Sequence, residues 1–220
     1  MGDWGKHIRR EDARYRDGES RLSELEDGDE RQRQLTRMGN AAYGAGLSHL
    51  MLGQRQEAAQ WFDRAVERYR ESLETAPPDS WGRYIGSLKA RILADDWSGA
   101  EDEARATLAA GAERSPSPIG RYAAALAHLV LGEDRDARRL ADHLRTEGDF
   151  PAGVGDALAM LAAASDAIGY VEAVEQVLES FERREEYLED VPVADTVIVL
   201  QALAARRDLV AELSSPLLPP

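Results

Sequence analysis

A chain of 220 residues, of which 43% are hydrophobic, is long enough to bury one sizeable core or two smaller ones. Its 41 acidic and 27 basic residues give a net charge of −14, which argues against generic nucleic-acid binding because that function requires a basic surface. Cysteine is absent, which excludes disulfide bonds, thiolate metal ligands and a cysteine nucleophile.

The basic residues are nearly all arginine, since only Lys6 and Lys89 are lysines. An acidic, lysine-poor composition is typical of a salt-rich cytoplasm, where about 1 M salt shortens the Debye length to roughly 3 Å and screens the repulsion between carboxylates. We therefore expect a halophilic bacterial or archaeal source. A GC-rich genome, which favours arginine and alanine over lysine, is the alternative explanation.

The polar N-terminus lacks the apolar segment of a signal peptide. No apolar run reaches the length of about 18 residues that a membrane helix requires. The sequence thus predicts a cytoplasmic protein without a membrane or nucleic-acid partner.

The first 28 residues are charged and have few apolar positions. Ile8, Tyr15 and Leu22 recur at intervals of seven and would form one narrow apolar stripe on a helix. This pattern predicts a leading helix that caps a stack of helices. The same stripe is a candidate contact for a homodimer.

Apolar residues at helical spacing follow in nine further segments, separated by proline and glycine turns. They predict four helix pairs over residues 30–190, a closing helix over 194–209 and a tail over 210–220. We therefore expect one helical-repeat domain over residues 1–220, with about nine to ten helices. The predicted helices cover residues 6–25, 30–52, 57–75, 81–93, 98–110, 122–131, 135–146, 157–167, 170–188 and 194–209.

The predicted pairs repeat. Their second helices carry an alanine near the start, at intervals of 42, 37 and 36 residues, which is close to the period of two-helix repeats. The first pair resembles the tetratricopeptide repeat (TPR) family, which has a small residue midway along the first helix, a glycine at the turn and an Ala-x3-aromatic-x2-Ala pattern on the second. The matching residues are Gly46, Gly53, Ala58, Phe62 and Ala65.

This resemblance implies an all-α fold, namely an α-α superhelix of TPR-like helix pairs. A small residue lets the second helix approach closely, and the aromatic ring fills the gap to the next unit. The later pairs match the pattern less well, so we expect an irregular stack. The resemblance further implies a non-enzymatic protein–protein interaction module that binds a peptide or partner protein.

A second resemblance is to the bacterial immunity protein family forty-nine of polymorphic toxin systems. It rests on the Arg-Tyr starts of two helices and on a closing tail over residues 203–207 and 215–219. It implies an alternative function, in which an acidic surface neutralises a basic toxin.

The candidate partner-binding residues begin with two Arg-Tyr pairs. Arginine offers a planar fork for carboxylates or phosphates, and tyrosine is an amphipathic anchor. The alternative is a helix-start arginine paired with a neighbouring acid, beside a core tyrosine. Tyr43 and Lys89 are expected in the groove, and two tryptophans would add contact area. The full set is Arg83, Tyr84, Arg121, Tyr122, Tyr43, Lys89, Trp81 and Trp97.

The other residues expected to line the groove are apolar, namely Leu47, Leu50, Met51, Ile85, Leu93, Leu126 and Leu129. Either the groove takes an apolar peptide or a helix of this chain fills it. His49 and His128 occupy equivalent positions in their units and are either an acid/base set or polar substitutes for a packing tyrosine. The acidic cluster at residues 185–190 is expected to be a solvated face. No phosphate loop or catalytic motif is present, so we expect no enzyme activity, no catalytic residue, no cofactor and no metal.

Overall fold

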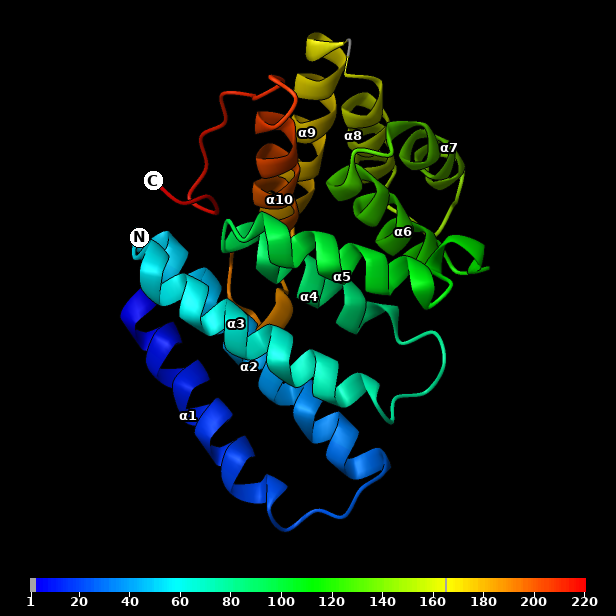
Figure 1. Cartoon of the computed structure of the whole chain (residues 1–220). Coiled ribbons are helices and arrows are strands. Elements are labelled where there is room, and N and C mark those ends of the chain that lie inside the picture. Colours follow the sequence, from blue (N-terminus) through cyan, green and yellow to red (C-terminus); the bar gives the residue numbers. More distant parts are fainter. Residues whose placement is uncertain (1–2, 165) are drawn as a thin grey trace. The chain divides into compact units, whose positions relative to one another are not determined.

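The computed structural model describes residues 3–164 and 166–220 (Figure 1). The protein is all-α, as predicted: these residues form ten α-helices and two short 3₁₀ segments, and they contain no strand. The helices are α1 (Trp4–Leu22), α2 (Asp29–Met51), α3 (Arg55–Leu73), α4 (Trp81–Leu93), α5 (Trp97–Ala109), α6 (Pro118–Leu131), α7 (Asp134–Leu144), α8 (Ala152–Ala163), α9 (Ala167–Glu182) and α10 (Asp195–Ala205).

The chain forms two compact units. Unit 1 comprises Met1–Asp96, Glu185–Val193 and Pro216–Pro220, and unit 2 comprises Trp97–Arg184 and Ala194–Ser215. Within each unit, every helix packs against the next one along the chain. The boundary at residues 96 and 97 divides the second predicted helix pair, with α4 in unit 1 and α5 in unit 2. The single domain over residues 1–220 stays a prediction.

The contact between α2 and α3 follows the packing rule expected of the first pair. Gly46 of α2 faces the ring of fully buried Phe62 on α3, and a Cβ atom at Gly46 would lie 2.6 Å from Phe62 Cε1. Tyr43 meets the same ring edge-on, with the ring centroids 5.5 Å apart. The two helices therefore approach so closely that the position admits only glycine without movement of the ring.

A second aromatic ring joins α2, α3 and α4. The buried ring of Tyr69 on α3 lies against Gly39 of α2 and Gly86 of α4, where added Cβ atoms would lie 2.6 and 2.7 Å from ring carbons. The Tyr69 hydroxyl donates a hydrogen bond of 2.9 Å to Asn40 Oδ1. This second glycine–aromatic contact was not predicted from the sequence.

The leading helix α1 packs on α2. Tyr15 and Leu22 of the predicted stripe are buried, and Ile8 is partly buried. The Tyr15 ring meets the Trp61 ring of α3 edge-on at 5.6 Å. Much of the stripe is therefore covered within its own unit, and the homodimer stays a prediction.

Three helix ends share one turn. After α2, α4 and α6, a residue with positive φ (Gly53, Asp95 or Gly132) precedes a residue whose N–H donates to the carbonyl five positions back. The same two residues also join through their side chains: His49 to Gln54 at 2.7 Å, Arg91 to Asp96 at 3.0 Å and His128 to Glu133 at 2.6 Å. This recurring turn is a structural repeat of the chain.

Several predicted boundaries in unit 2 are wrong, and among them α8 ends at Ala163 rather than residue 167 and α10 at Ala205 rather than residue 209. Helix α6 begins at Pro118 rather than residue 122, because proline suits the first helical position and the Ser117 hydroxyl accepts a hydrogen bond from the Ile119 N–H at 3.2 Å. Helix α8 begins five residues before its predicted start, since Gly155 serves close packing: a Cβ there would lie 3.0 Å from Arg145 N. Helix α9 ends at Glu182 rather than residue 188, because the residues that follow Phe181 are charged and exposed and do not continue its buried face.

The β-branched stretch at residues 196–200 lies in helix α10, as predicted. Most of this helix is buried, and it packs on α8 and α9 within unit 2. Among the described helices, none is both long and apolar enough to cross a membrane.

Candidate functional site

Arg83, the first predicted contact residue, lies in a polar network that joins α4 to α2 and α3. Its Nε donates to Thr36 Oγ1 at 2.8 Å, and its Nη2 donates to Gln32 Oε1. Thr36 Oγ1 lies 2.8 Å from Ser72 Oγ on α3. All these partners are neutral, and burial lowers the pKa of Arg83. Arg83 therefore connects three helices, which neither interpretation of the sequence anticipated.

The other predicted residues of unit 1 are partly or fully buried. Trp81 is buried against Tyr84, with ring centroids 5.7 Å apart, and Tyr84 is partly exposed. Tyr43 and Lys89 are both buried. Of these residues, Arg83 and Tyr84 retain the accessible surface that a partner contact requires.

The second Arg-Tyr pair lies in unit 2. Arg121 pairs with Glu147, and Tyr122 is buried against the Phe150 ring at 5.5 Å. These contacts match the alternative stated for the pair, a helix-start arginine with a neighbouring acid and a core tyrosine. Trp97 is partly exposed, and the Arg206 guanidinium lies 4.2 Å from its ring centroid.

The residues expected to line an open groove lie mostly in the core. The buried ones are Tyr43, Leu47, Leu50, Met51, Lys89, Leu93, Tyr122, Leu126 and Leu129. Ile85 is partly exposed. These side chains are therefore buried by the chain itself.

The two histidines belong to the recurring turn. His49 hydrogen-bonds to the amide of Gln54, whereas His128 meets the carboxylate of Glu133. Their equivalent positions thus have a structural cause, because each joins the last turn of its helix to the start of the next.

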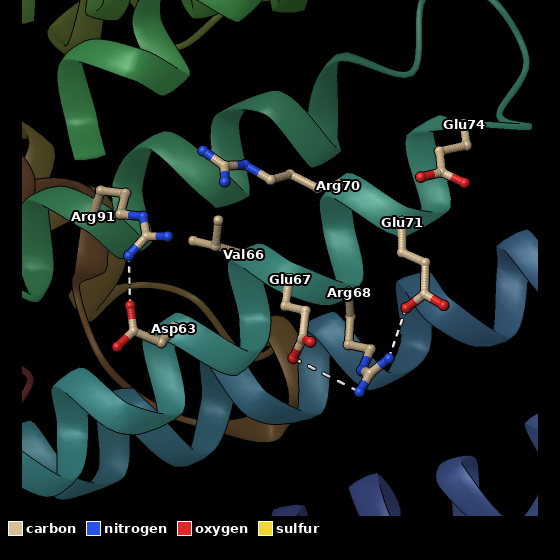
Figure 2. A pocket seen from close by; sticks show the side chains of 8 residues that line it. All are labelled: Asp63, Val66, Glu67, Arg68, Arg70, Glu71, Glu74 and Arg91. Atoms are coloured by element: carbon tan, nitrogen blue, oxygen red, sulfur yellow. Dashed lines mark hydrogen bonds and ion pairs between the residues drawn. The ribbon is translucent and has the colours of Figure 1, made fainter.

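A cleft of about 420 Å³ lies along α3, and Arg91 of α4 contributes to its lining. Figure 2 shows the residues that line the cleft. Arg91 pairs with Asp63 at one end of the cleft, and Glu74 lies at the other end. Three arginines and four acids surround one buried valine. The lining residues are Asp63, Val66, Glu67, Arg68, Arg70, Glu71, Glu74 and Arg91.

Ion pairs hold the cleft arginines in place. Arg91 bridges Asp63 and Asp96, with N–O distances of 2.5 and 3.0 Å. Arg68 donates to Glu71 at 2.6 Å and to the Tyr15 hydroxyl at 3.0 Å. Burial alone would lower the pKa of Arg68, but these hydrogen bonds and the nearby carboxylates outweigh it and raise the pKa. Two of the three cleft arginines, Arg68 and Arg91, are therefore held by ion pairs with acids of the same unit.

Sequence reasoning missed a charged cluster on α1. Glu11 is fully buried, and its carboxylate accepts from Arg10 Nε at 2.6 Å and Arg14 Nη1 at 2.9 Å. Burial raises the pKa of Glu11, although both arginines oppose the shift. Glu11 lies between Ile8 and Tyr15 on the predicted apolar stripe. A carboxylate on an otherwise apolar face was the one feature of the sequence that could have indicated a buried charged cluster.

The raised pKa of Glu11 predicts a pH-dependent stability difference between the wild type and Glu11→Gln. Because the folded pKa lies above its ordinary value of 4.5, the folded protein binds the proton more tightly. The free energy of unfolding of the wild type should therefore rise relative to the variant as the pH falls toward 4.5, by at most about 1.4 kcal/mol per pH unit. This contribution is lost above the folded pKa. Urea unfolding at several pH values measures it, and a constant difference would contradict the assignment.

Comparison of the chain with family models, curated proteins and solved structures found no match in any of the three. Over the residues that the structure describes, no group of three or more histidines and acids is placed to hold a metal ion. The fold defines the class: an all-α protein of sequentially packed helices, an arrangement compatible with a helical repeat.

Proposed function

We propose that the protein is a non-enzymatic, cytoplasmic interaction module that binds a partner protein at the cleft between α3 and α4. The observation that carries the proposal is the cleft lining, with three arginines and four acids around Val66. A partner protein can present both acidic and basic side chains, which would pair with the arginines and the acids of the lining. Arginine is enriched at protein interfaces, where its planar fork pairs with carboxylates.

Pre-ordered side chains favour this mode of binding. Arg68 and Arg91 are already paired with acids of the unit, so a partner that contacts them immobilises few additional rotamers. Arg70 is exposed on the same face of α3. The predicted contacts Arg83 and Tyr84 lie on α4, the helix that contributes Arg91 to the cleft.

A TPR-like repeat is the second part of the proposal. It is supported by the close contact of Gly46 with Phe62 and by the recurring turn after α2, α4 and α6. Such repeats present surfaces for partner proteins. We also propose that the helix pairs form a superhelical stack. We further propose that the protein works in a salt-rich cytoplasm, and partner binding should therefore be measured at both high and low salt.

Charge reversal at Arg70 is expected to abolish partner capture. Tagged wild type, Arg70→Glu and Arg55→Glu are compared in affinity capture from an extract of the source organism. Arg55 is exposed on the same helix but outside the cleft, so its variant has the same charge and should keep the partner. Arg70→Glu should lose at least about tenfold in captured partner, since like charges across an interface cost several kcal/mol. Equal capture by the two variants would refute the cleft.

Toxin neutralisation is the second candidate function, and an acidic stripe on α9 favours it. Glu172, Glu175, Glu179 and Glu182 are all exposed at helical spacing, and Arg183 pairs with only one of them, Glu179. A basic enzyme would be steered to this stripe, and its association would slow steeply with salt. Association rates that do not depend on salt would exclude this candidate.

A further inference from the structure

Residues 185–193 form a strap that belongs to unit 1, although the helices before and after it, α9 and α10, belong to unit 2. The strap contains a short 3₁₀ turn at Leu188–Asp190, which contacts α2. In Figure 1 it lies in the orange part of the chain, between α9 and α10. It covers a surface of α1 and α2 that we call the seat, consisting of Arg10, Arg14 and the α2 surface around Gly44.

Charge holds one side of the strap. Arg14 Nη1 pairs with the Glu189 carboxylate, whose side chain is only 12% exposed. Arg10 donates to the Glu189 carbonyl oxygen and lies 3.7 Å from Asp190 Oδ2. The buried carboxylate of Glu11 accepts hydrogen bonds from the guanidinium groups of both Arg10 and Arg14, which fixes their positions. The seat thus recognises a carboxylate side chain together with its own backbone carbonyl.

Apolar contacts hold the other side. Val191 and Val193 are buried, whereas the intervening Pro192 is partly exposed. Gly44 makes room for Val191, because a Cβ at Gly44 would lie 3.3 Å from Val191 Cγ2. The seat therefore accepts one acid followed, two positions later, by an apolar residue that fits beside Gly44.

The strap does not fit the seat without strain. Glu189 and Asp190 both have left-handed backbones, with φ of 55° and 51°. This conformation is unfavourable for residues other than glycine, because the Cβ atom lies too close to the following carbonyl oxygen. A peptide with glycine at such a position would make the same contacts without this penalty.

From these contacts we infer that the seat is a peptide-binding site for an acidic segment of a partner protein, and that the strap occupies it in the unbound chain. The inference rests on the proposed interaction function and names a second contact for its partner. Because the strap is tethered, its effective concentration at the seat is on the order of millimolar. It therefore excludes ligands with low affinity for the seat and is displaced by a ligand with high affinity. The strap is thus an internal competitor.

A labelled nonapeptide with the sequence of residues 185–193 tests the inference by fluorescence anisotropy. The full-length variant Glu189→Ala, Val191→Ala, Val193→Ala removes the strap contacts and leaves the seat intact. It should bind the peptide at least about tenfold more tightly than the wild type does. A peptide with glutamine in place of the Glu189 equivalent should bind more weakly. Equal affinity of the folded triple variant and the wild type would overturn the inference.

Arg14 and Arg16 supply a matched control on α1. Added to the triple variant, Arg14→Ala should reduce peptide affinity about tenfold, because it removes the charged partner of the peptide carboxylate. Arg16→Ala should leave it unchanged, since Arg16 pairs with Asp12 and not with the strap. Equal effects of the two would contradict the seat.

Hydrogen exchange on the wild type gives an independent readout if the triple variant does not fold. Saturating peptide should increase exchange of the amides of residues 185–193, and unchanged exchange would overturn the inference. Arg70→Glu lies outside the seat and should bind the peptide normally. An Arg70→Glu variant that keeps its partner refutes the α3–α4 cleft alone, whereas failure of the peptide to bind refutes the seat alone.

Discussion

Truncating Tyr69 to alanine is expected to lower the free energy of unfolding by about 3–5 kcal/mol. The buried ring fills the space between Gly39 and Gly86, so its loss leaves a cavity where three helices meet. Neither glycine has a side chain that could fill this cavity. Urea unfolding followed by circular dichroism measures the change.

Tyr69→Phe is the matched control. It keeps the ring and removes the hydrogen bond to Asn40, so it should cost only about 0.5–1.5 kcal/mol. A loss below 1 kcal/mol for Tyr69→Ala, or equal losses for the two variants, would show that the ring does not join α2, α3 and α4.

The second large effect is expected from Gly46→Ala, which should destabilise the protein by about 1–3 kcal/mol. The added Cβ would lie 2.6 Å from Phe62 Cε1, so α2 and α3 must separate or the ring must leave its rotamer. This steric effect opposes the roughly 1 kcal/mol that alanine contributes over glycine in an unhindered helix.

Gly82→Ala isolates the helix-propensity effect. Gly82 is exposed on α4, and nothing lies within 4 Å of an added Cβ, so its variant should be unchanged or slightly more stable. Thermal unfolding of both variants measures the contrast. Equal stability of Gly46→Ala and the wild type would contradict the close contact of α2 with α3 at Gly46.

Local patterns in the sequence predicted the helices well where apolar spacing and breakers agreed. Helix α4 was predicted with its observed bounds, Trp81–Leu93, because prolines precede it and an acidic turn follows. The start of α8 was wrong, because Gly153 and Gly155 were interpreted as loop residues. Glycine that breaks a helix and glycine that allows two helices to touch have the same sequence signature.

The contacts of the candidate binding residues were harder to predict than the helices, because the residues that meet are distant in sequence. Arg83 was identified as important, yet its partners Gln32 and Thr36 lie 51 and 47 residues away. The position of an arginine at the start of a helix does not indicate which neutral side chains of other helices will accept its hydrogen bonds. The seat was missed because the acidic residues near Glu189 were interpreted as a solvated face, whereas Arg14 pairs with that carboxylate.

The α3–α4 cleft was not predicted as a site at all. Its acids and arginines on α3 have the ordinary pattern of an exposed helix face, which is common in a chain with 41 acidic residues. Only the packing of α4 beside α3, which brings Arg91 to Asp63, turns that face into a cleft.

The most direct test of the proposed function is hydrogen exchange of the captured complex compared with the free protein. The α3–α4 cleft predicts new protection in residues 63–74 and 83–91 and none along the exposed face of α9. Protection confined to residues 172–182, with exchange on α3 and α4 unchanged, would contradict the proposal and favour toxin neutralisation.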